Sequence, residues 1–324
     1  MDNNSSSVNP VYFFNEEESG HCLAFVQDEI GASLLCGRED GTVSVWDLTT
    51  LRMKESAVLC AGSMPCISVN ICGRNLITQD KTGLIKFWEK SETWKERRSL
   101  QLDYCGFCKI TVNSEQNLIA CPHKSCILQV YNMEFEEISI LKPDETKNKF
   151  GYVMNCKFVK SNEKCFLLVS YENGSLILWD LETKIPLSEL NVSKCPVFAL
   201  DFDDGKNQGV CGSNTRKLSV FKLHESSSLE NISTIKIKTA GVGSVRILPS
   251  QEILVVGCWD SMIRIFSWKY LKLLTVMSFH SQSIEDLCFS SKNSEVLDCE
   301  CVLFATSRDK KISIWNVSDF CALA

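Results

Sequence analysis

The stretch Cys36–Asp47, which reads CGREDGTVSVWD, begins with a small residue, passes through a polar turn and continues as an alternating strand that leads to an aromatic side chain. Six further stretches of the 324-residue chain repeat this pattern. They are TQDKTGLIKFWE (Thr78–Glu89), CPHKSCILQVYN (Cys121–Asn132), VSYENGSLILWD (Val169–Asp180), CGSNTRKLSVFK (Cys211–Lys222), VGCWDSMIRIFS (Val256–Ser267) and ATSRDKKISIWN (Ala305–Asn316). The closing aromatics of successive copies lie 42 to 49 residues apart, which is enough for four short strands and their turns.

The seven copies also agree in register. Their closing aromatics are Trp46, Trp88, Tyr131, Trp179, Phe221, Phe266 and Trp315. In every copy the residues three and one positions earlier are apolar, and the residue ten positions earlier is small. Side chains three and one positions before the aromatic share one face of a strand, and the aromatic lies on the other. Each closing strand is therefore predicted to be buried on both faces, as in a β-propeller, whose blades are each sandwiched between two neighbours.

The repeats predict an all-β, seven-bladed β-propeller over residues 10–324, preceded by a disordered tail of residues 1–9. Alternating segments such as Pro196–Phe202 and Ile284–Phe289 are expected to form the inner strands of the blades that follow. Only nine residues come after Trp315, which is short for a turn and an outer strand. We therefore expect Val11–Phe14 to supply the outer strand of the last blade and to close the ring.

Composition and charge exclude some classes of partner and indicate the location of the protein. The formal net charge is −6, and binding to nucleic acids usually needs a basic surface, so no nucleic-acid partner is expected. The chain has no run of 18 apolar residues, and the polar Met1–Asn9 segment lacks the apolar core of a secretory signal. We therefore expect no membrane partner and a cytoplasmic location, a nuclear one, or both. Three of the 18 cysteines, Cys36, Cys121 and Cys211, occupy the small position of the repeat, which favours core packing over metal binding.

Four repeats end in tryptophan, and two of these continue with aspartate, at Trp46-Asp47 and Trp179-Asp180. With this pattern the chain resembles the WD40-repeat proteins, which implies a WD40 propeller closed by its N-terminal outer strand. Within that family, five segments resemble the group to which the fungal ASTRA-associated proteins belong. They are Gly106–Lys109, Glu172–Leu181, Pro196–Asp203, Trp259–Trp268 and Asp309–Trp315.

The second resemblance implies a monomeric, non-catalytic scaffold or adaptor without a cofactor. Its protein partners would be a chaperone assembly with AAA+ ATPases and the phosphatidylinositol-3-kinase-related kinases, whose maturation and stability it would assist. Those kinases serve the DNA damage response and nutrient signalling.

One cluster resembles a catalytic site. His280, Asp309 and a hydroxyl from Thr306 or Ser307 imitate a Ser-His-Asp set, which would also need an exposed nucleophile and an oxyanion hole. The resemblance to WD40 proteins implies instead a structural hydrogen-bonded tetrad of His280, Ser307, Asp309 and Trp315. We favour the structural interpretation.

The six-residue spacing from Asp309 to Trp315 recurs in other blades. Asp40 precedes Trp46 by the same interval, with His21 as a candidate partner, and Asp260 precedes Phe266. A position that repeats from blade to blade is expected of a structural device and not of a catalytic site.

Three other groups carry weaker signals. Cys105 and Cys108 form a C-x-x-C in a segment expected to be an inner strand, where core packing is favoured over a redox or zinc role. Cys299 and Cys301 are expected to be exposed thiols in a loop. The basic Lys95–Arg98 segment is expected to be a solvated turn between strands, and the four histidines show no metal-ligand spacing.

Partners of propellers commonly bind the face formed by the loops before the closing strands. The residues seven positions before each aromatic should point from that face, and they are Glu39, Lys81, Lys124, Glu172, Asn214, Trp259 and Arg308. Trp259 is the only large aromatic among them, so we predict that Trp259 and Arg308 form a hot spot for a partner. The long Lys142–Tyr152 connection is expected on the same face and Ser290–Glu300 on the opposite one.

Two other binding functions are alternatives to the adaptor. A G-protein β subunit that acts in signalling would carry a long N-terminal helix for a coiled coil, whereas about ten polar residues without heptads precede the first strand here. A substrate receptor of a ubiquitin ligase would be expected to carry an accessory domain. No cluster of residues supports an enzyme better than it supports a structural role.

Overall fold

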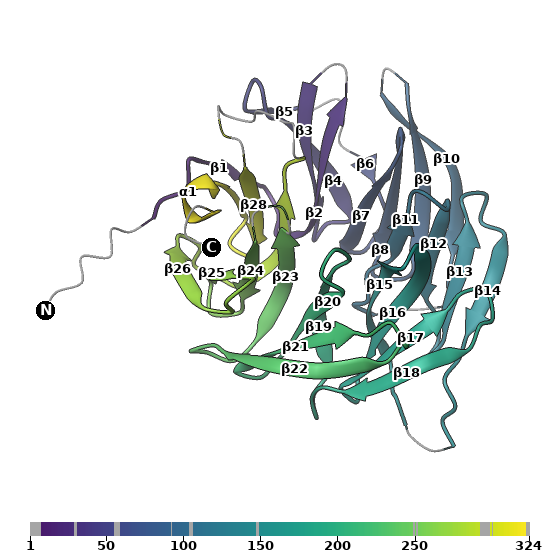
Figure 1. Cartoon of the computed structure of the whole chain (residues 1–324). Coiled ribbons are helices and arrows are strands. Elements are labelled where there is room, and N and C mark those ends of the chain that lie inside the picture. Colours follow the sequence, from purple (N-terminus) through teal and green to yellow (C-terminus); the bar gives the residue numbers. More distant parts are fainter. Residues whose placement is uncertain are drawn as a thin grey trace, which may run out of the picture.

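The computed structural model describes residues 8–28, 31–54, 59–91, 93–103, 106–146, 149–248, 250, 252–291, 299 and 301–321. Within these residues, seven antiparallel sheets form a ring around a central channel (Figure 1). This arrangement confirms the predicted seven-bladed propeller. The predicted tail falls mostly on residues 1–7, which lie outside the described part of the chain.

Each blade has an inner strand beside the channel, two middle strands and an outer strand. The inner strands are β2 (Gly20–Asp28), β7 (Cys66–Cys72), β11 (Thr111–Asn113), β15 (Val153–Ser161), β19 (Val197–Asp203), β23 (Val242–Leu248) and β27 (Ile284–Phe289). The second strands are β3 (Gly31–Arg38), β8 (Asn75–Asp80), β12 (Leu118–Pro122), β16 (Lys164–Tyr171), β20 (Gln208–Ser213), β24 (Ile253–Cys258) and β28 (Val302–Ser307).

The third strands are the closing strands of the sequence repeat. They are β4 (Thr42–Asp47), β9 (Leu84–Lys90), β13 (Leu128–Asn132), β17 (Ser175–Asp180), β21 (Lys217–Leu223), β25 (Met262–Ser267) and β29 (Lys311–Asn316). The outer strands are β5 (Arg52–Met53) with β6 (Leu59–Cys60), β10 (Trp94–Gln101), β14 (Glu137–Leu141), β18 (Pro186–Asn191), β22 (Leu229–Lys236), β26 (Leu273–Ser278) and β1 (Tyr12–Asn15). A single helical turn, α1 (Ser318–Cys321), follows β29.

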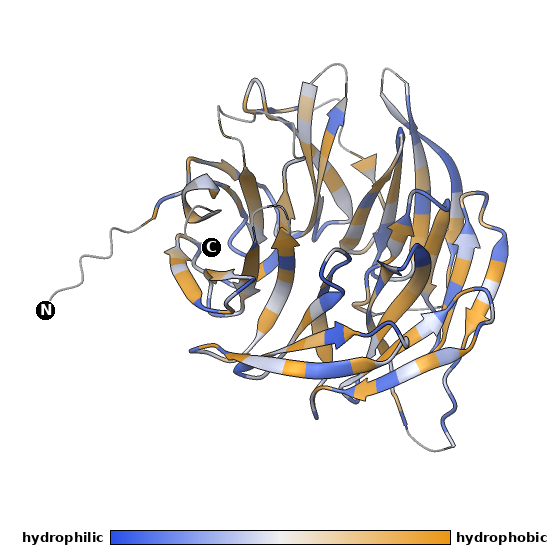
Figure 2. Ribbon diagram, viewed as in Figure 1, coloured by the Kyte–Doolittle hydropathy of each residue, from blue (hydrophilic) through white to orange (hydrophobic). Residues whose placement is uncertain are grey.

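The apolar core lies between neighbouring blades and follows the repeat register. All fourteen apolar residues one and three positions before the closing aromatics are buried, and so are the seven aromatics and the seven small residues ten positions before them. Burying one such aliphatic side chain stabilises the fold by about 1.5–3 kcal/mol. Figure 2 shows this difference between inner and outer positions: β24 is apolar along its length, whereas the outer strand β22 mixes apolar and polar residues.

The N-terminal strand closes the ring as predicted. Strand β1 pairs antiparallel with β29, with Tyr12 opposite Ile314 and Phe14 opposite Ile312. The buried Phe14 ring also stacks on the indole of Trp46 in the first blade, with 4.2 Å between ring centroids. One segment therefore completes the last blade and packs against the first.

Glu16, just after β1, extends this contact through hydrogen bonds. Its buried carboxylate accepts hydrogen bonds from Trp46 Nε1 and Ser44 Oγ, both at 2.6 Å, and pairs with Arg38 Nη1 at 3.4 Å. The expected partnership of His21 with Asp40 around Trp46 is therefore wrong. The ring-closing segment, and not the blade itself, supplies the acceptor for this tryptophan.

Two local expectations are also wrong. Lys95–Arg98 does not form a turn but lies within the outer strand β10, where Arg97 pairs with Glu89 at 2.5 Å. Cys299 and Cys301 are buried and not exposed, because both pack into apolar clusters beside β28. The rest of the Ser290–Glu300 loop falls largely on residues 292–298 and 300, outside the described residues.

Candidate functional site

A recurring bulge shapes the channel. In six inner strands the pairing register shifts at the second residue, so that this residue has no direct partner across the ladder. The six bulged residues are His21, Ile67, Met154, Phe198, Gly243 and Glu285. A bulge re-aims the side chain that it carries, and all six residues line the channel cavity, whose volume is about 740 Å³.

Large apolar side chains are exposed on the face at which this cavity, lined there by Phe107 and Trp259, has its mouth. Met64, Phe107 and Tyr152 are exposed on the segments that lead into the inner strands of three consecutive blades. Trp259 is exposed in the turn between β24 and β25. Because the second strand of a blade runs antiparallel to the inner strand, this turn lies on the same face as the entry segments. The four side chains therefore share the face that the repeat pattern predicted for partners.

Trp259 is fixed in place although 44% of its surface is exposed. Its ring lies 5.7 Å from the ring of Phe198, at an interplanar angle of 52°. It also covers Gly241, where an added Cβ would come within 2.3 Å of the indole and where φ is +102°. A rigid, half-exposed aromatic of this kind loses little conformational entropy when a partner covers it.

Arg308 is held at the same mouth by Glu285. The Arg308 Nε–H donates to Glu285 Oε1 at 2.8 Å, and Ser283 Oγ donates to the same oxygen at 2.6 Å. Burial would raise the pKa of Glu285, but His21, Ser283 and Arg308 together hold this pKa below its ordinary value. Glu285 is therefore charged at neutral pH and positions Arg308, whose side chain remains mostly exposed.

The other predicted rim residues also lie at the surface. Glu39, Lys124, Glu172 and Asn214 are exposed, and Lys81 is half-buried. Lys81 places its Nζ 4.7 Å from the centre of the Phe107 ring, which is a cation–π contact.

The end of the Lys142–Tyr152 connection packs against the turn that contains Glu172. Tyr152 N–H donates to the Glu172 carboxylate at 3.1 Å, and the backbone N–H of Asn173 donates to the carbonyl oxygen of Phe150. This end of the connection is therefore on the predicted face, while residues 147 and 148 lie outside the described part of the chain.

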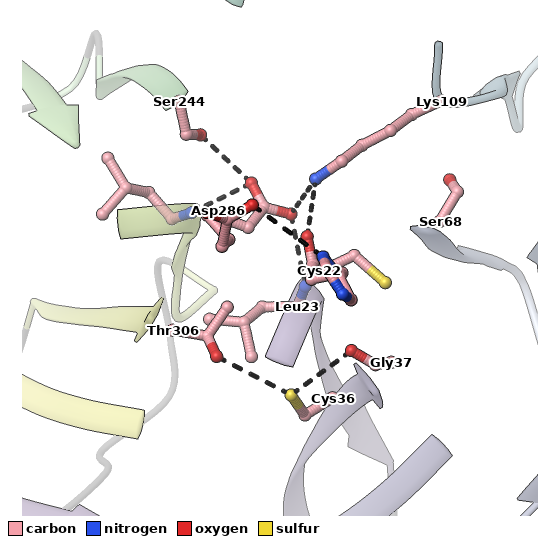
Figure 3. Close-up of polar contacts among 12 residues, drawn as sticks. Cys22, Leu23, Cys36, Gly37, Ser68, Lys109, Ser244, Asp286 and Thr306 are labelled. Carbon is pink, nitrogen blue, oxygen red and sulfur yellow. Dashed lines mark hydrogen bonds and ion pairs between the residues drawn. The ribbon is translucent and has the colours of Figure 1, made fainter. Parts of the chain in front are cut away.

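Below the mouth, a buried aspartate joins four blades. Asp286 of β27 accepts hydrogen bonds from Lys109 Nζ at 2.9 Å, from Ser244 Oγ at 3.1 Å and from the backbone N–H of Leu23 at 3.2 Å (Figure 3). Arg246 Nη2 donates to the same carboxylate at 2.9 Å. Burial would raise the pKa of Asp286, but the two cations hold it below its ordinary value. The carboxylate is therefore charged and fully engaged.

A second buried carboxylate continues this arrangement. Asp201 of β19 pairs with Lys157 Nζ of β15 at 2.7 Å and accepts the backbone N–H of Ile247 at 2.6 Å. Lys157, Asp201 and Arg246 each come three residues after the bulge of their strand. Equivalent positions of three adjacent blades thus carry alternating charges. We call Lys109, Asp286, Arg246, Asp201 and Lys157 the channel charge chain.

The sequence repeats did not single out these five residues. A signal was present for two of them, because Asp201 and Asp286 lie on the predicted inner strands Pro196–Phe202 and Ile284–Phe289, where a charged side chain needs a partner when it is buried. The partners come from distant repeats, and periodicity within one repeat cannot identify them.

The hydrogen-bonded tetrad is present with a different hydroxyl. His280 Nδ1 contacts Asp309 Oδ2 at 3.0 Å, and His280 Nε2 contacts Ser313 Oγ at 2.7 Å. Trp315 Nε1–H donates to the same Ser313 oxygen at 2.6 Å. Ser307 does not have the expected place between His280 and Trp315, since its hydroxyl donates to the carbonyl oxygen of Gln282 and accepts the backbone N–H of Asp309. Ser313 precedes Trp315 by two residues, so the two side chains share one face of β29.

The residue two positions before the aromatic has a similar role in other blades. Ser44 donates to Glu16 in the first blade, and Arg264 pairs with Asp260 at 2.6 Å in the sixth. Asp260 thus binds an arginine, because Phe266 offers no donor. These contacts join an acidic or histidine side chain from an adjoining segment to the closing strand.

The cysteine sites are packing positions. Cys108 is buried, and burial, followed by the nearby Cys156, raises its pKa well above the ordinary value. It lies before β11 and not in a strand as expected, while Cys105 falls outside the described residues. Cys36 is also buried and contacts Thr306 Oγ1 at 3.9 Å (Figure 3). Thiols with raised pKa values form little of the reactive thiolate.

Metal-binding clusters and membrane-spanning helices are both absent from the described residues. They contain no group of three or more His, Cys, Asp or Glu side chains that could hold a metal ion. Among the same residues, no helix has the length and apolar character needed to cross a membrane.

Comparisons with known proteins agree with this architecture. A family model described as "WD domain, G-beta repeat" matches residues 229–267 and 271–316. ASTRA-associated protein 1 of Schizosaccharomyces pombe is 24% identical over 376 residues, covering 96% of this chain and 100% of that protein. ASTRA-associated protein 1 of Verticillium alfalfae is 22% identical over 312 residues, covering 84% and 76%.

Another relative is closer in sequence than these two fungal proteins. Guanine nucleotide-binding protein subunit beta-like protein 1 of Mus musculus is 30% identical over 298 residues, and the alignment covers 88% of this chain and 87% of that protein. At this identity and coverage, together with the seven blades, the two chains are homologous along nearly their whole length. The chain belongs to the family of guanine nucleotide-binding protein subunit beta-like protein 1, within the WD40-repeat proteins.

Proposed function

We propose that this chain is a non-catalytic adaptor that binds protein partners at the mouth of its channel and assists the chaperone-linked maturation and stability of phosphatidylinositol-3-kinase-related kinases. The observation that carries the proposal is the fixed, half-exposed Trp259, which stands on the same face as Arg308 and the exposed Phe107. The names of the fungal relatives, which call them ASTRA-associated, support a role within a larger assembly.

The chemistry of the mouth supports protein binding. Tryptophan and arginine are the residue types enriched among interface positions that contribute most to affinity. Exposed large apolar side chains that gather on one face of a soluble domain typically mark a surface for another protein. Here two of them, Phe107 and Trp259, line the cavity, so a partner that covers this face can also insert a side chain into the channel.

The tetrad supports a structural role and not catalysis. His280 is buried, and both of its ring nitrogens are engaged, one by Asp309 and one by Ser313. The hydroxyl of Ser313 is buried and also accepts the indole N–H of Trp315. A nucleophile must be reachable by a substrate, and this hydroxyl is enclosed within the seventh blade.

The test is affinity purification of the tagged protein from its own cells, followed by mass spectrometry of the associated proteins. We expect the phosphatidylinositol-3-kinase-related kinases together with chaperone and AAA+ ATPase components. Recovery of G-protein subunits or of cullin components in their place would overturn the proposal in favour of a signalling scaffold or a ubiquitin-ligase receptor.

Two variants test whether the partners bind at the mouth of the channel. Trp259→Ala and Arg308→Glu should each lower partner recovery about tenfold, because a hot-spot residue typically contributes 1.4 kcal/mol or more. Tyr270→Ala is the matched control, since Tyr270 is an exposed aromatic of the same blade in the turn between β25 and β26, on the opposite face. Arg74→Glu, in the turn between β7 and β8, is the control for the charge reversal. Undiminished recovery with both folded mouth variants would refute the assignment of this face.

A further inference from the structure

We propose that the channel beneath Trp259 binds the carboxylate side chains of an acidic peptide segment of a protein partner. The inference rests on the proposed function in one respect, namely that a protein docks on this face. It adds the chemistry of the segment that enters the channel.

The first argument is the charge of the lining. The cavity is lined by four basic residues, Lys109, Lys157, Arg246 and Arg308, and by three acidic residues, Asp201, Glu285 and Asp286. The lining therefore carries a formal charge of +1, although the whole chain carries −6. The channel is a local exception to the acidic balance of the molecule.

The second argument is the difference in exposure between the two signs. Asp286 and Asp201 expose only 4% and 7% of their side chains, whereas Lys109, Lys157 and Arg246 expose 32%, 36% and 36%. A group that enters the channel therefore has better access to these ammonium and guanidinium groups than to the carboxylates of Asp286 and Asp201.

The third argument is the supply of hydrogen-bond donors. The Asp286 oxygens already accept from Lys109, Arg246, Ser244 and Leu23 and have little capacity for a ligand. An ammonium group has three N–H donors and a guanidinium has five. Lys157 directs one donor to Asp201, and Lys109 directs two, to Asp286 and to the carbonyl oxygen of His21, so both ammonium groups keep at least one N–H for a group that enters. Carboxylates match this supply, because an ionised carboxylate is an acceptor only.

The aromatic rim points to a peptide as the source of the carboxylates. Trp259 and Phe198 are in contact at the mouth, and Phe107 is exposed near it, so apolar residues next to the acidic ones would find partners there. A cavity of about 740 Å³ is large enough to admit several side chains. Nucleic acid is disfavoured as the occupant, because the net charge of the molecule repels a phosphate backbone.

The experiment measures the binding of fluorescein-labelled heptapeptides to the purified full-length protein by fluorescence anisotropy. The probe has a central leucine flanked by two glutamates on each side and capped by glycines. Peptides with glutamine or lysine in place of the glutamates are the comparisons. We expect the glutamate peptide to bind most tightly, and its affinity should fall as sodium chloride is raised from about 50 to about 300 mM.

Two variants of one ion pair make the test specific. Lys157→Gln should weaken binding of the glutamate peptide about fivefold, because it removes a partly exposed cation. Asp201→Asn should strengthen binding about threefold, because it leaves Lys157 free for the ligand. Loss of stability cannot explain effects of opposite sign. Lys160→Gln is the matched control, since Lys160 lies at the far end of the same strand, outside the cavity lining, and should change nothing.

Equal affinity for the glutamate and glutamine peptides would overturn the inference, and so would a shift in the same direction for Lys157→Gln and Asp201→Asn. If the peptides fail to discriminate while kinases are still recovered from cells, the adaptor proposal stands and the acidic-segment inference falls. If the glutamate peptide binds as expected while no kinases are recovered, the inference holds and the adaptor proposal falls.

Discussion

Replacing Glu16 by alanine removes the acceptor that joins the ring-closing segment to the first blade. The Glu16 side chain is 1% exposed, and it receives the indole N–H of Trp46, the hydroxyl of Ser44 and the guanidinium of Arg38. The substitution leaves the buried indole N–H and the hydroxyl unpaired. It also removes the nearer of the two carboxylates that neutralise Arg38, and the other, Asp40, remains at 3.5 Å.

The cost follows from these three losses. Breaking a buried ion pair by removing one partner typically costs about 3–5 kcal/mol. An unpaired buried donor costs about 1–3 kcal/mol. The losses are not additive, and Asp40 still neutralises part of the Arg38 charge after Glu16 is removed. We therefore expect Glu16→Ala to lower the free energy of unfolding by about 3 kcal/mol.

Urea denaturation followed by circular dichroism and tryptophan fluorescence measures this change. Glu17→Ala is the matched control, because Glu17 is the adjacent glutamate and its side chain is exposed. We expect the control to change the free energy of unfolding by less than about 0.5 kcal/mol. A Glu16→Ala variant within about 1 kcal/mol of the control would refute the reasoning that this carboxylate fastens the ring.

A double variant separates the ion pair from the other two contacts. Combining Glu16→Ala with Arg38→Met removes both charges, so the penalty for an uncompensated guanidinium disappears. We expect the double variant to be more stable than Glu16→Ala alone. A simple sum of the two single losses would show that the pair itself contributes nothing.

The remaining predictions concern the seventh blade. Deleting residues 1–14 removes the outer partner of β29 and should lower the thermal midpoint by more than about 10 °C in circular dichroism; an unchanged midpoint would contradict the closure. Burial would raise the pKa of Asp309, but the hydrogen bond with His280 holds it below its ordinary value. A carboxyl with a depressed folded pKa adds stability above its unfolded pKa and loses it as pH falls through the folded value. The stability difference between wild type and Asp309→Asn in urea should therefore shrink from pH 7 to pH 3, and a constant difference would count against the contact. Ser313→Ala should cost about 2 kcal/mol, because it unpairs the indole N–H and His280, and Ser307→Ala about 1 kcal/mol; the reverse order in urea denaturation would contradict the tetrad assignment.

The blade architecture could be predicted because the residue pattern of each closing strand shows that both of its faces are buried. Leu176 and Leu178 face one neighbour while Trp179 faces the other, and all three are buried. Only a strand covered on both sides tolerates this pattern. The origin of the last outer strand followed from the number of residues left after Trp315 and from the apolar Val11–Phe14 segment.

The tetrad hydroxyl belongs to Ser313 instead of the expected Ser307, and the sequence contains the signal that distinguishes them. Ser307 and Ser313 are both fully buried, so burial does not distinguish them. Strand alternation does, since Ser313 shares a face with Trp315 at a spacing of two residues. Ser44 has the same spacing to Trp46, and both of these side chains donate to the same oxygen of Glu16.

The channel charge chain could not be derived in this way. Lys109 and Asp286 are separated by 177 positions in the sequence, and their contact depends on how the third and seventh blades face each other across the axis. The repeat pattern concerns contacts between neighbouring strands and blades. It does not fix which charged side chains meet in the space that all the blades enclose.

The pairing of β1 with β29 also sets a condition on the synthesis of this protein. Strand β1 is the first to be made and its partner is the last, with roughly 300 residues between them. At about 5–20 residues per second, β1 waits roughly 15–60 s before β29 exists. During this interval the backbone edge groups of β1 have no native partner strand. The nascent chain therefore carries an unpaired strand edge until the last blade is complete.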